Sequence, residues 1–164
     1  MKLKTIIAIV VIMATFTACQ KPEKGDAGTP GKDGNANVQS TSFNVTGWTW
    51  DATNYWRYSS WTNVSLLTQD VIDGGAVMLY QKMSSGEYIA LPISANITST
   101  VQEHDFFFYN VGTLKIIIEN SDLSDPNPAG YLYKLVCIPK AARIKNPNVN
   151  MLNYSEVKKA YDIE

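Results

Sequence analysis

Short runs of β-prone residues, each closed by turn residues, limit the fold of this chain more than any other feature of its sequence. Apolar side chains alternate or are continuous within the runs, and Gly, Asn, Ser and Pro separate one run from the next. About seven such strands with no helices between them predict an all-β fold, an antiparallel β-sandwich rather than an α/β fold. The predicted strands cover residues 41–46, 56–66, 76–81, 87–91, 97–109, 113–119 and 131–138.

Local patterns place some side chains within these strands. Phe43 and Val45 alternate with polar residues, so they should share one face of their strand. The turn sequence at 84–86 should join two neighbouring strands as a hairpin. The continuous aromatic run at 106–109 predicts a segment that is buried on both faces or shared between two layers.

Two short helical segments are expected as well. Thr68 is a capping residue and glycines follow at 74–75, which predicts a single helical turn between strands. Asn153, with Glu156 three places on, is typical of the start of a short C-terminal helix that would cover an open edge or end of the sandwich. One face of this helix would carry Tyr154, Val157, Ala160 and Tyr161.

The N-terminus has the order of a bacterial lipoprotein signal. Lysines near the start precede an uncharged apolar run over residues 6–16, and small residues then lead to Cys19. The apolar run is shorter than the roughly 20 residues that a bilayer-spanning helix needs. We therefore predict a cleaved signal peptide at 1–18, acylation of Cys19 and anchoring of the mature chain in a lipid bilayer. Gln20 stands where an aspartate would favour the inner membrane, so the expected location is the outer membrane or the cell surface.

Residues 19–37 form a segment with a different composition. Glycine recurs at every third position, at Gly25, Gly28, Gly31 and Gly34, as a collagen triple helix requires. Two interpretations remain open: a solvated, disordered tether, which we prefer because the triplets are few, and a triple helix that would assemble three chains.

Together these features resemble a family of uncharacterised Bacteroidetes-type lipoproteins with a short collagen-like linker. The resemblance begins with the lipoprotein signal and the triplets that run into residues 34–38, and continues in 68–80, 146–150 and 153–159. It implies a location in the cell envelope and a β-rich domain at 38–164, and it brings no activity and no catalytic residues.

Charge and cysteine usage exclude several classes of function. The chain has 164 residues and a formal net charge of -1, and no Lys/Arg run stands out, so a nucleic-acid partner is not expected. With Cys19 acylated, Cys137 is left alone and no intrachain disulfide can form. The hydrophobic core must therefore hold the fold together.

The sequence offers no catalytic constellation. His104 is the only histidine, and its neighbours Glu103 and Asp105 should point to the opposite face of the strand, so we expect His104 to face solvent. Cys137 shares a predicted face with Tyr133 and Leu135, where a lone cysteine is usually a small core residue. No nucleophile elbow, phosphate-binding loop or dinucleotide motif is present. We predict a non-enzymatic protein without a cofactor, and a secreted hydrolase is the least favoured alternative.

The sequence contains two further candidate sites, an oxygen-rich loop and an aromatic cluster. The loop at 122–127 offers oxygen ligands for calcium but lacks EF-hand spacing, so no metal site is assigned to it. An aromatic cluster lies between Trp48 and Trp61; alternation places Trp56 and Tyr58 on an apolar face and Trp61 on a polar one, unless a bulge near 59–60 reverses the order. Trp61 is therefore the one candidate ligand contact.

These observations predict a lipid-anchored envelope protein with a non-enzymatic binding or structural role. The alternative is a carbohydrate-binding or adhesin-like module, because flat aromatic rings on a β-sheet surface can stack on sugars. The partners expected are the bilayer, through Cys19, and a glycan or protein ligand.

Overall fold

The computed structural model describes residues 37–128 and 130–163, which belong to the unit Asp33–Glu164. The predicted signal peptide, Cys19 and the collagen-like triplets lie outside the described residues.

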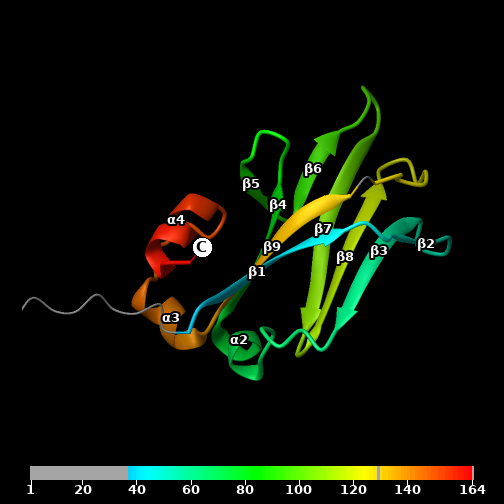
Figure 1. Ribbon diagram of the computed structural model, residues 1–164. Coiled ribbons are helices and arrows are strands. Elements are labelled where there is room, and N and C mark those ends of the chain that lie inside the picture. The colour runs from blue at the N-terminus through cyan, green and yellow to red at the C-terminus, as the bar shows by residue number, and fades with distance from the viewer. Residues whose placement is uncertain (1–36, 129, 164) are drawn as a thin grey trace, which may run out of the picture. The chain divides into compact units, whose positions relative to one another are not determined.

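The described chain is an antiparallel β-sandwich, as predicted, with nine strands in two sheets (Figure 1). The four-stranded sheet has the order β1 (Gln39–Val45), β9 (Tyr131–Ile138), β4 (Ala76–Lys82) and β5 (Tyr88–Ala90). The five-stranded sheet has the order β2 (Thr49–Asp51), β3 (Trp56–Thr62), β8 (Thr113–Asn120), β7 (Gln102–Asn110) and β6 (Ile93–Asn96).

The strands beyond the predicted seven arise from local turns. The expected strand at 97–109 is wrong in its first part, because the chain turns back there and separates β6 from β7. Thr98 makes this turn: its hydroxyl oxygen accepts hydrogen bonds from the backbone N–H of Thr100 and Val101, which competes with strand pairing. At the end of the unexpected strand β2, the Asp51 carboxylate accepts from the N–H of Thr53 in the same way.

The main core lies between the two sheets. Leu79 and Leu135 of the four-stranded sheet are fully buried, as is Ile116 of the five-stranded sheet. Phe43 and Val45 both point into this core, which confirms their predicted common face. Burial of these side chains is the main stabilising contribution, at roughly 25 cal/mol for each Å² of apolar surface removed from water.

Three short helices complete the described fold: α2 (Gln69–Gly74), at the predicted helical turn, α3 (Lys140–Lys145) and α4 (Tyr154–Tyr161). The N-cap of α4 is as predicted, since the Asn153 side chain accepts hydrogen bonds from the N–H of Ser155 and Glu156. The sequence did not predict α3.

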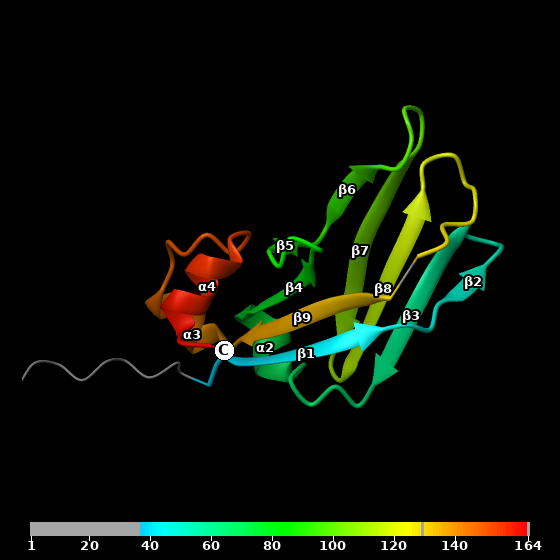
Figure 2. The ribbon, with the colours of Figure 1, turned by 45° about the horizontal axis from the view of Figure 1, so that its top comes forward.

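The C-terminal helices cover the outer face of the four-stranded sheet, so the prediction that α4 covers an edge or end is wrong. Val157 and Tyr161 of α4 are buried in a second core with Tyr80, Val136 and Ile138. The Tyr80 hydroxyl also donates a 2.6 Å hydrogen bond to the carbonyl of Met151. The helices pack there because β4 and β9 carry apolar side chains on both faces, so the outer face of the sheet must be covered as well. Figure 2 shows α3 and α4 on the side of this sheet that is away from the five-stranded sheet.

Candidate functional site

Strand β3 faces the opposite way from the prediction. Trp61 pairs with Leu114 of β8 and Ser59 pairs with Ile116, both of which point into the main core. Side chains of directly paired residues lie on the same face of a sheet, so Trp61 points toward the core. Its ring contacts Phe43 of the other sheet edge to face, at 5.0 Å between centroids. The placement of Trp61 on a solvent-facing polar surface, with Trp56 and Tyr58 in the core, is therefore wrong.

No bulge causes this reversal. The pairing of β3 with β8 runs without interruption from Trp56–Glu119 to Thr62–Thr113. The strand instead ends at Thr62, and Asn63 takes a left-handed conformation with φ of 59°. Val64 and Leu66 follow this break and pack on the core, although alternation through an unbroken strand would place them on the side of Trp56.

The rings that the core does not use form a surface on the outer side of the five-stranded sheet. We call this surface the outer aromatic face. It consists of Trp56 and Tyr58 of β3, Phe106 and Phe108 of β7, and Lys115 of β8 between them. Of these, Phe108 is the most open, with 55% of its surface exposed.

The rings of the outer aromatic face hold one another in place. Trp56 and Phe106 meet edge to face at 6.4 Å, and Phe106 and Phe108 do so at 5.7 Å. The Lys115 ammonium lies 4.2 Å from the centroid of Tyr58, within the range of a cation–π interaction. Ile117, which lies between Tyr58 and Phe106, is fully buried although it points outward. The rings thus form a packed layer rather than isolated side chains.

Polar side chains border this layer on the same face of the sheet. Glu119 pairs with Trp56 on one side and with His104 on the other, and Ser94 of β6 lies beyond His104. The His104 Nδ1 and the Ser94 hydroxyl are 2.7 Å apart and share a hydrogen bond. Flat apolar rings next to hydrogen-bonding groups suit a ligand that has both apolar C–H faces and hydroxyl groups.

Of the two arrangements predicted for the aromatic run at 106–109, burial on both faces is wrong. Phe106 and Phe107 are half-buried, and Phe108 and Tyr109 are exposed by 55% and 45%. Phe107 and Tyr109 lie on the core side of β7, while Phe106 and Phe108 belong to the outer aromatic face. The run is continuous in sequence because both faces of β7 use aromatic residues.

The candidate catalytic groups are not brought together. His104 lies on the outer face, whereas Glu103 and Asp105 lie on the inner one. Asp105 is buried, and this burial, with the nearby charge of Glu103, raises its pKa to about 7. Cys137 is buried in the main core, where loss of hydration raises the pKa of its thiol to about 12 and leaves it unreactive.

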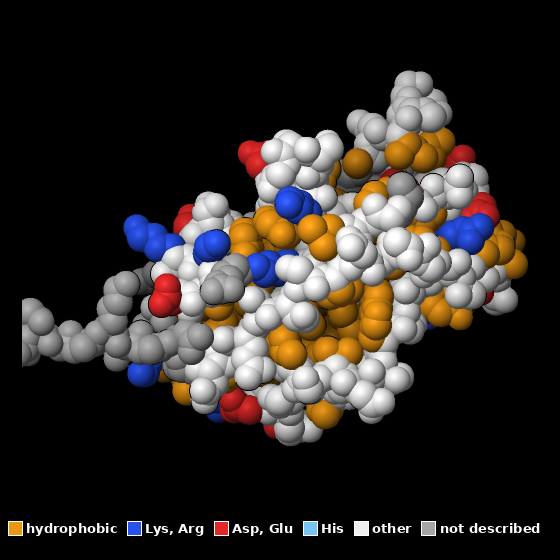
Figure 3. All heavy atoms as spheres, in the orientation of Figure 1, with side chains coloured by type: hydrophobic (Ala, Val, Ile, Leu, Met, Phe, Trp, Pro, Cys, Tyr) orange, Lys and Arg blue, Asp and Glu red, His pale blue; other side chains and the backbone are white. Residues whose placement is uncertain are grey.

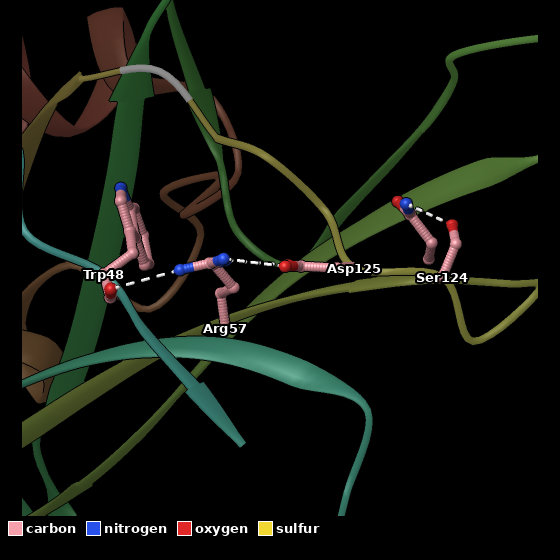
Figure 4. A network of polar contacts seen from close by, with 5 residues as sticks. Trp48, Arg57, Ser124 and Asp125 are labelled. Carbon is pink, nitrogen blue, oxygen red and sulfur yellow. Dashed lines mark hydrogen bonds and ion pairs between the residues drawn. The ribbon is translucent and has the colours of Figure 1, made fainter. Parts of the chain in front are cut away.

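Carboxylate oxygens of the loop at 122–127 accept hydrogen bonds from other groups of the protein. Arg57 donates two hydrogen bonds of 2.7 Å to the Asp125 carboxylate (Figure 4), and this contact lowers the pKa of Asp125. An oxygen of Asp122 accepts from both the N–H and the hydroxyl of Ser124. Across the described residues, no group of three or more His, Cys, Asp or Glu side chains is placed to bind a metal.

The outer aromatic face is a candidate site that the sequence did not predict. The signal that would have found it is in β8, where Leu114, Ile116 and Ile118 alternate with Lys115 and Glu119. The polar positions of a central strand mark the outer face, and the residues paired with them lie on that face too.

Comparison with known proteins identifies no relative: no protein-family model, no curated protein and no solved structure matches this chain. No helix in the described part of the chain is long and apolar enough to cross a membrane.

Proposed function

We propose that this protein is a lipid-anchored protein of the bacterial cell envelope that binds a glycan, without catalysis, through its outer aromatic face. Residues 1–18 are the signal peptide, acylated Cys19 holds the protein at the outer membrane, and residues 19–37 tether the domain at 38–164. The observation that carries the binding role is the packed layer of Trp56, Tyr58, Phe106 and Phe108 on the solvent side of the five-stranded sheet.

A glycan fits this surface better than a purely apolar ligand. The C–H face of a pyranose ring stacks on flat aromatic rings, and its hydroxyl groups need donors and acceptors nearby. Lys115, His104 and Glu119 supply such groups on the same face. The buried Ile117 and the ring-to-ring contacts keep the platform rigid, so little conformational entropy is lost on binding.

The second candidate is a structural role, in which the domain contacts another protein of the envelope. In this case the outer aromatic face would contact another protein rather than a sugar. The two candidates differ in what removal of single rings does to glycan retention.

The test is affinity electrophoresis of the protein through gels that contain bacterial or plant polysaccharides. We expect retention in at least one gel, and we expect Tyr58→Ala and Phe108→Ala to abolish it, since loss of one stacking ring removes a large share of the contact. Tyr109→Ala is the matched control, because Tyr109 is also an exposed ring of the same sheet but points to the other face. Equal loss in the control, or no retention in any gel, would reject the glycan.

A further inference from the structure

The domain has a second surface with a distinct chemistry, formed by α3, α4 and the segment between them. We call residues 140–163 the helical layer. Its charged side chains are Lys140, Arg143, Lys145, Lys158 and Lys159 against Glu156 and Asp162. The sandwich at 38–139 has the opposite balance, with four basic and nine acidic residues. Figure 3 shows Lys and Arg side chains over the helices, together with some acidic side chains.

Apolar side chains are also exposed on the helical layer. Leu152 and Ile144 have exposed fractions of 68% and 66%, the largest among the large hydrophobic residues that the structure describes. Ile144 lies directly between Arg143 and Lys145 in the sequence. Exposed aliphatic groups among lysines are typical of surfaces that lie on a bilayer.

A groove of about 500 Å³ crosses the helical layer between residues 145–149 and α4. Lys145 and Lys159 border the groove from its two sides, and the amides of Asn146 and Asn148 add hydrogen-bond donors. Glu156 also lines it, and its carboxylate oxygens accept hydrogen bonds from the N–H of Asn150 and the side-chain amide of Asn153, so the lining holds two basic side chains and one acidic one. The groove therefore suits a small anionic group.

The N-terminal segment joins the domain on this side. Val38 is buried in the second core, together with Ala142 of α3 and Val157 of α4. The chain between Cys19 and Asn37 reaches at most about 65 Å when fully extended. A lipid on Cys19 would thus keep the domain within this distance of a membrane, at a high effective concentration, and attached on the side of the helical layer.

We propose that the helical layer is the surface with which the domain rests on an anionic lipid bilayer, and that the groove between Lys145 and Lys159 receives a phospholipid headgroup. This inference rests on the proposed lipid anchor for its location. It leaves the outer aromatic face, on the opposite sheet, available to a ligand while the domain is docked.

The test uses the chain from residue 19 onward with Cys19→Ser, so that no acyl chain contributes, and measures sedimentation with vesicles. We expect binding to vesicles with phosphatidylglycerol and none to vesicles of phosphatidylcholine alone. Lys159→Glu should weaken binding by at least about tenfold, and replacing Lys145 and Lys159 together by Glu should weaken it further. Ile144→Ser should weaken it too, by removing the inserted side chain. The circular dichroism spectrum and melting temperature of each variant show whether it is folded.

Matched controls distinguish binding at this site from the effects of overall charge and overall hydrophobicity. Lys82→Glu makes the same change as Lys159→Glu at an exposed position of the sandwich, and Ile97→Ser matches Ile144→Ser in an exposed turn. Neither should weaken binding. The proposal fails if a control weakens binding as much as its partner variant or if the vesicles are not bound. Retention on polysaccharide gels and acylation of Cys19 are measured separately, so their failure is distinguishable.

Discussion

Asp105 shows how one residue can make the stability of the whole domain depend on pH. It is 3% exposed, and no described residue supplies a hydrogen-bond partner for its Oδ1. Burial favours the neutral carboxyl group and raises its pKa to about 7. The folded protein thus binds this proton more tightly than the unfolded chain does. The contribution of protonated Asp105 to the free energy of unfolding is fully present below about pH 4, and it is lost as the pH rises to about 7.

As this contribution is lost with rising pH, we expect the free energy of unfolding to fall by up to about 1.4 kcal/mol per pH unit across this range. Asp105→Asn keeps the shape of the neutral acid and cannot ionise, so it should raise the stability at pH 8 and flatten the pH dependence. Urea denaturation at pH 5 and pH 8 measures both effects. Asp73→Asn, the same substitution at an exposed position, is the control and should not raise the stability at pH 8. A wild-type protein as stable at pH 8 as at pH 5 would contradict this account.

At the scale of the structural elements, the orientation of strand β3 can be tested directly, because two neighbouring serines lie on its opposite faces. Ser59 is half-buried and pairs with Ile116, whose side chain is fully buried in the main core. Ser60 is exposed and pairs with Lys115 on the outer face. The two residues have the same side chain and the same strand, and differ only in the face they occupy.

Ser59→Asp should therefore destabilise the fold by about 2 kcal/mol or more, since it directs a charge toward the core. Ser60→Asp should cost little, because its carboxylate stays in water near the Lys115 ammonium. Chemical denaturation of both variants gives the difference directly. The opposite order would restore the orientation that alternation alone predicted, with Trp61 on the surface.

At the scale of the whole molecule, the two faces of the sandwich are divided between two proposed tasks. The helices cover the four-stranded sheet and would face the bilayer under the second proposal, while the rings on the outer side of the five-stranded sheet would contact the ligand under the first. Both proposals place the domain at a membrane, and this placement depends on Cys19. Its thiol would take the thioether-linked lipid, which a hydroxyl cannot do.

Cys19→Ser should therefore leave the full-length precursor unprocessed or release a soluble form. Fractionation of cells into membrane and soluble proteins, followed by detection of the chain, checks this. Cys137→Ser provides the control, because Cys137 is buried in the core and should have no part in anchoring. Membrane association of Cys19→Ser equal to that of the wild type would reject the lipoprotein signal.

What the sequence determined by itself is local. Alternation and turn residues placed β9 at Tyr131–Ile138, the helical turn after Thr68 and the cap of α4 at Asn153, because each depends on hydrogen bonds and side chains a few positions apart. The all-β class followed from these elements and their spacing.

Tertiary structure decided which faces are buried. Alternation divides β3 into two faces but does not say which one meets the core; pairing with β8 does, and it sends Trp61 inward and Trp56 outward. In the same way, apolar residues on both faces of β4 and β9 do not reveal that α3 and α4, rather than another sheet, cover the outer one. Side-chain direction within a strand is a local property, whereas burial depends on what packs against that strand from elsewhere in the chain.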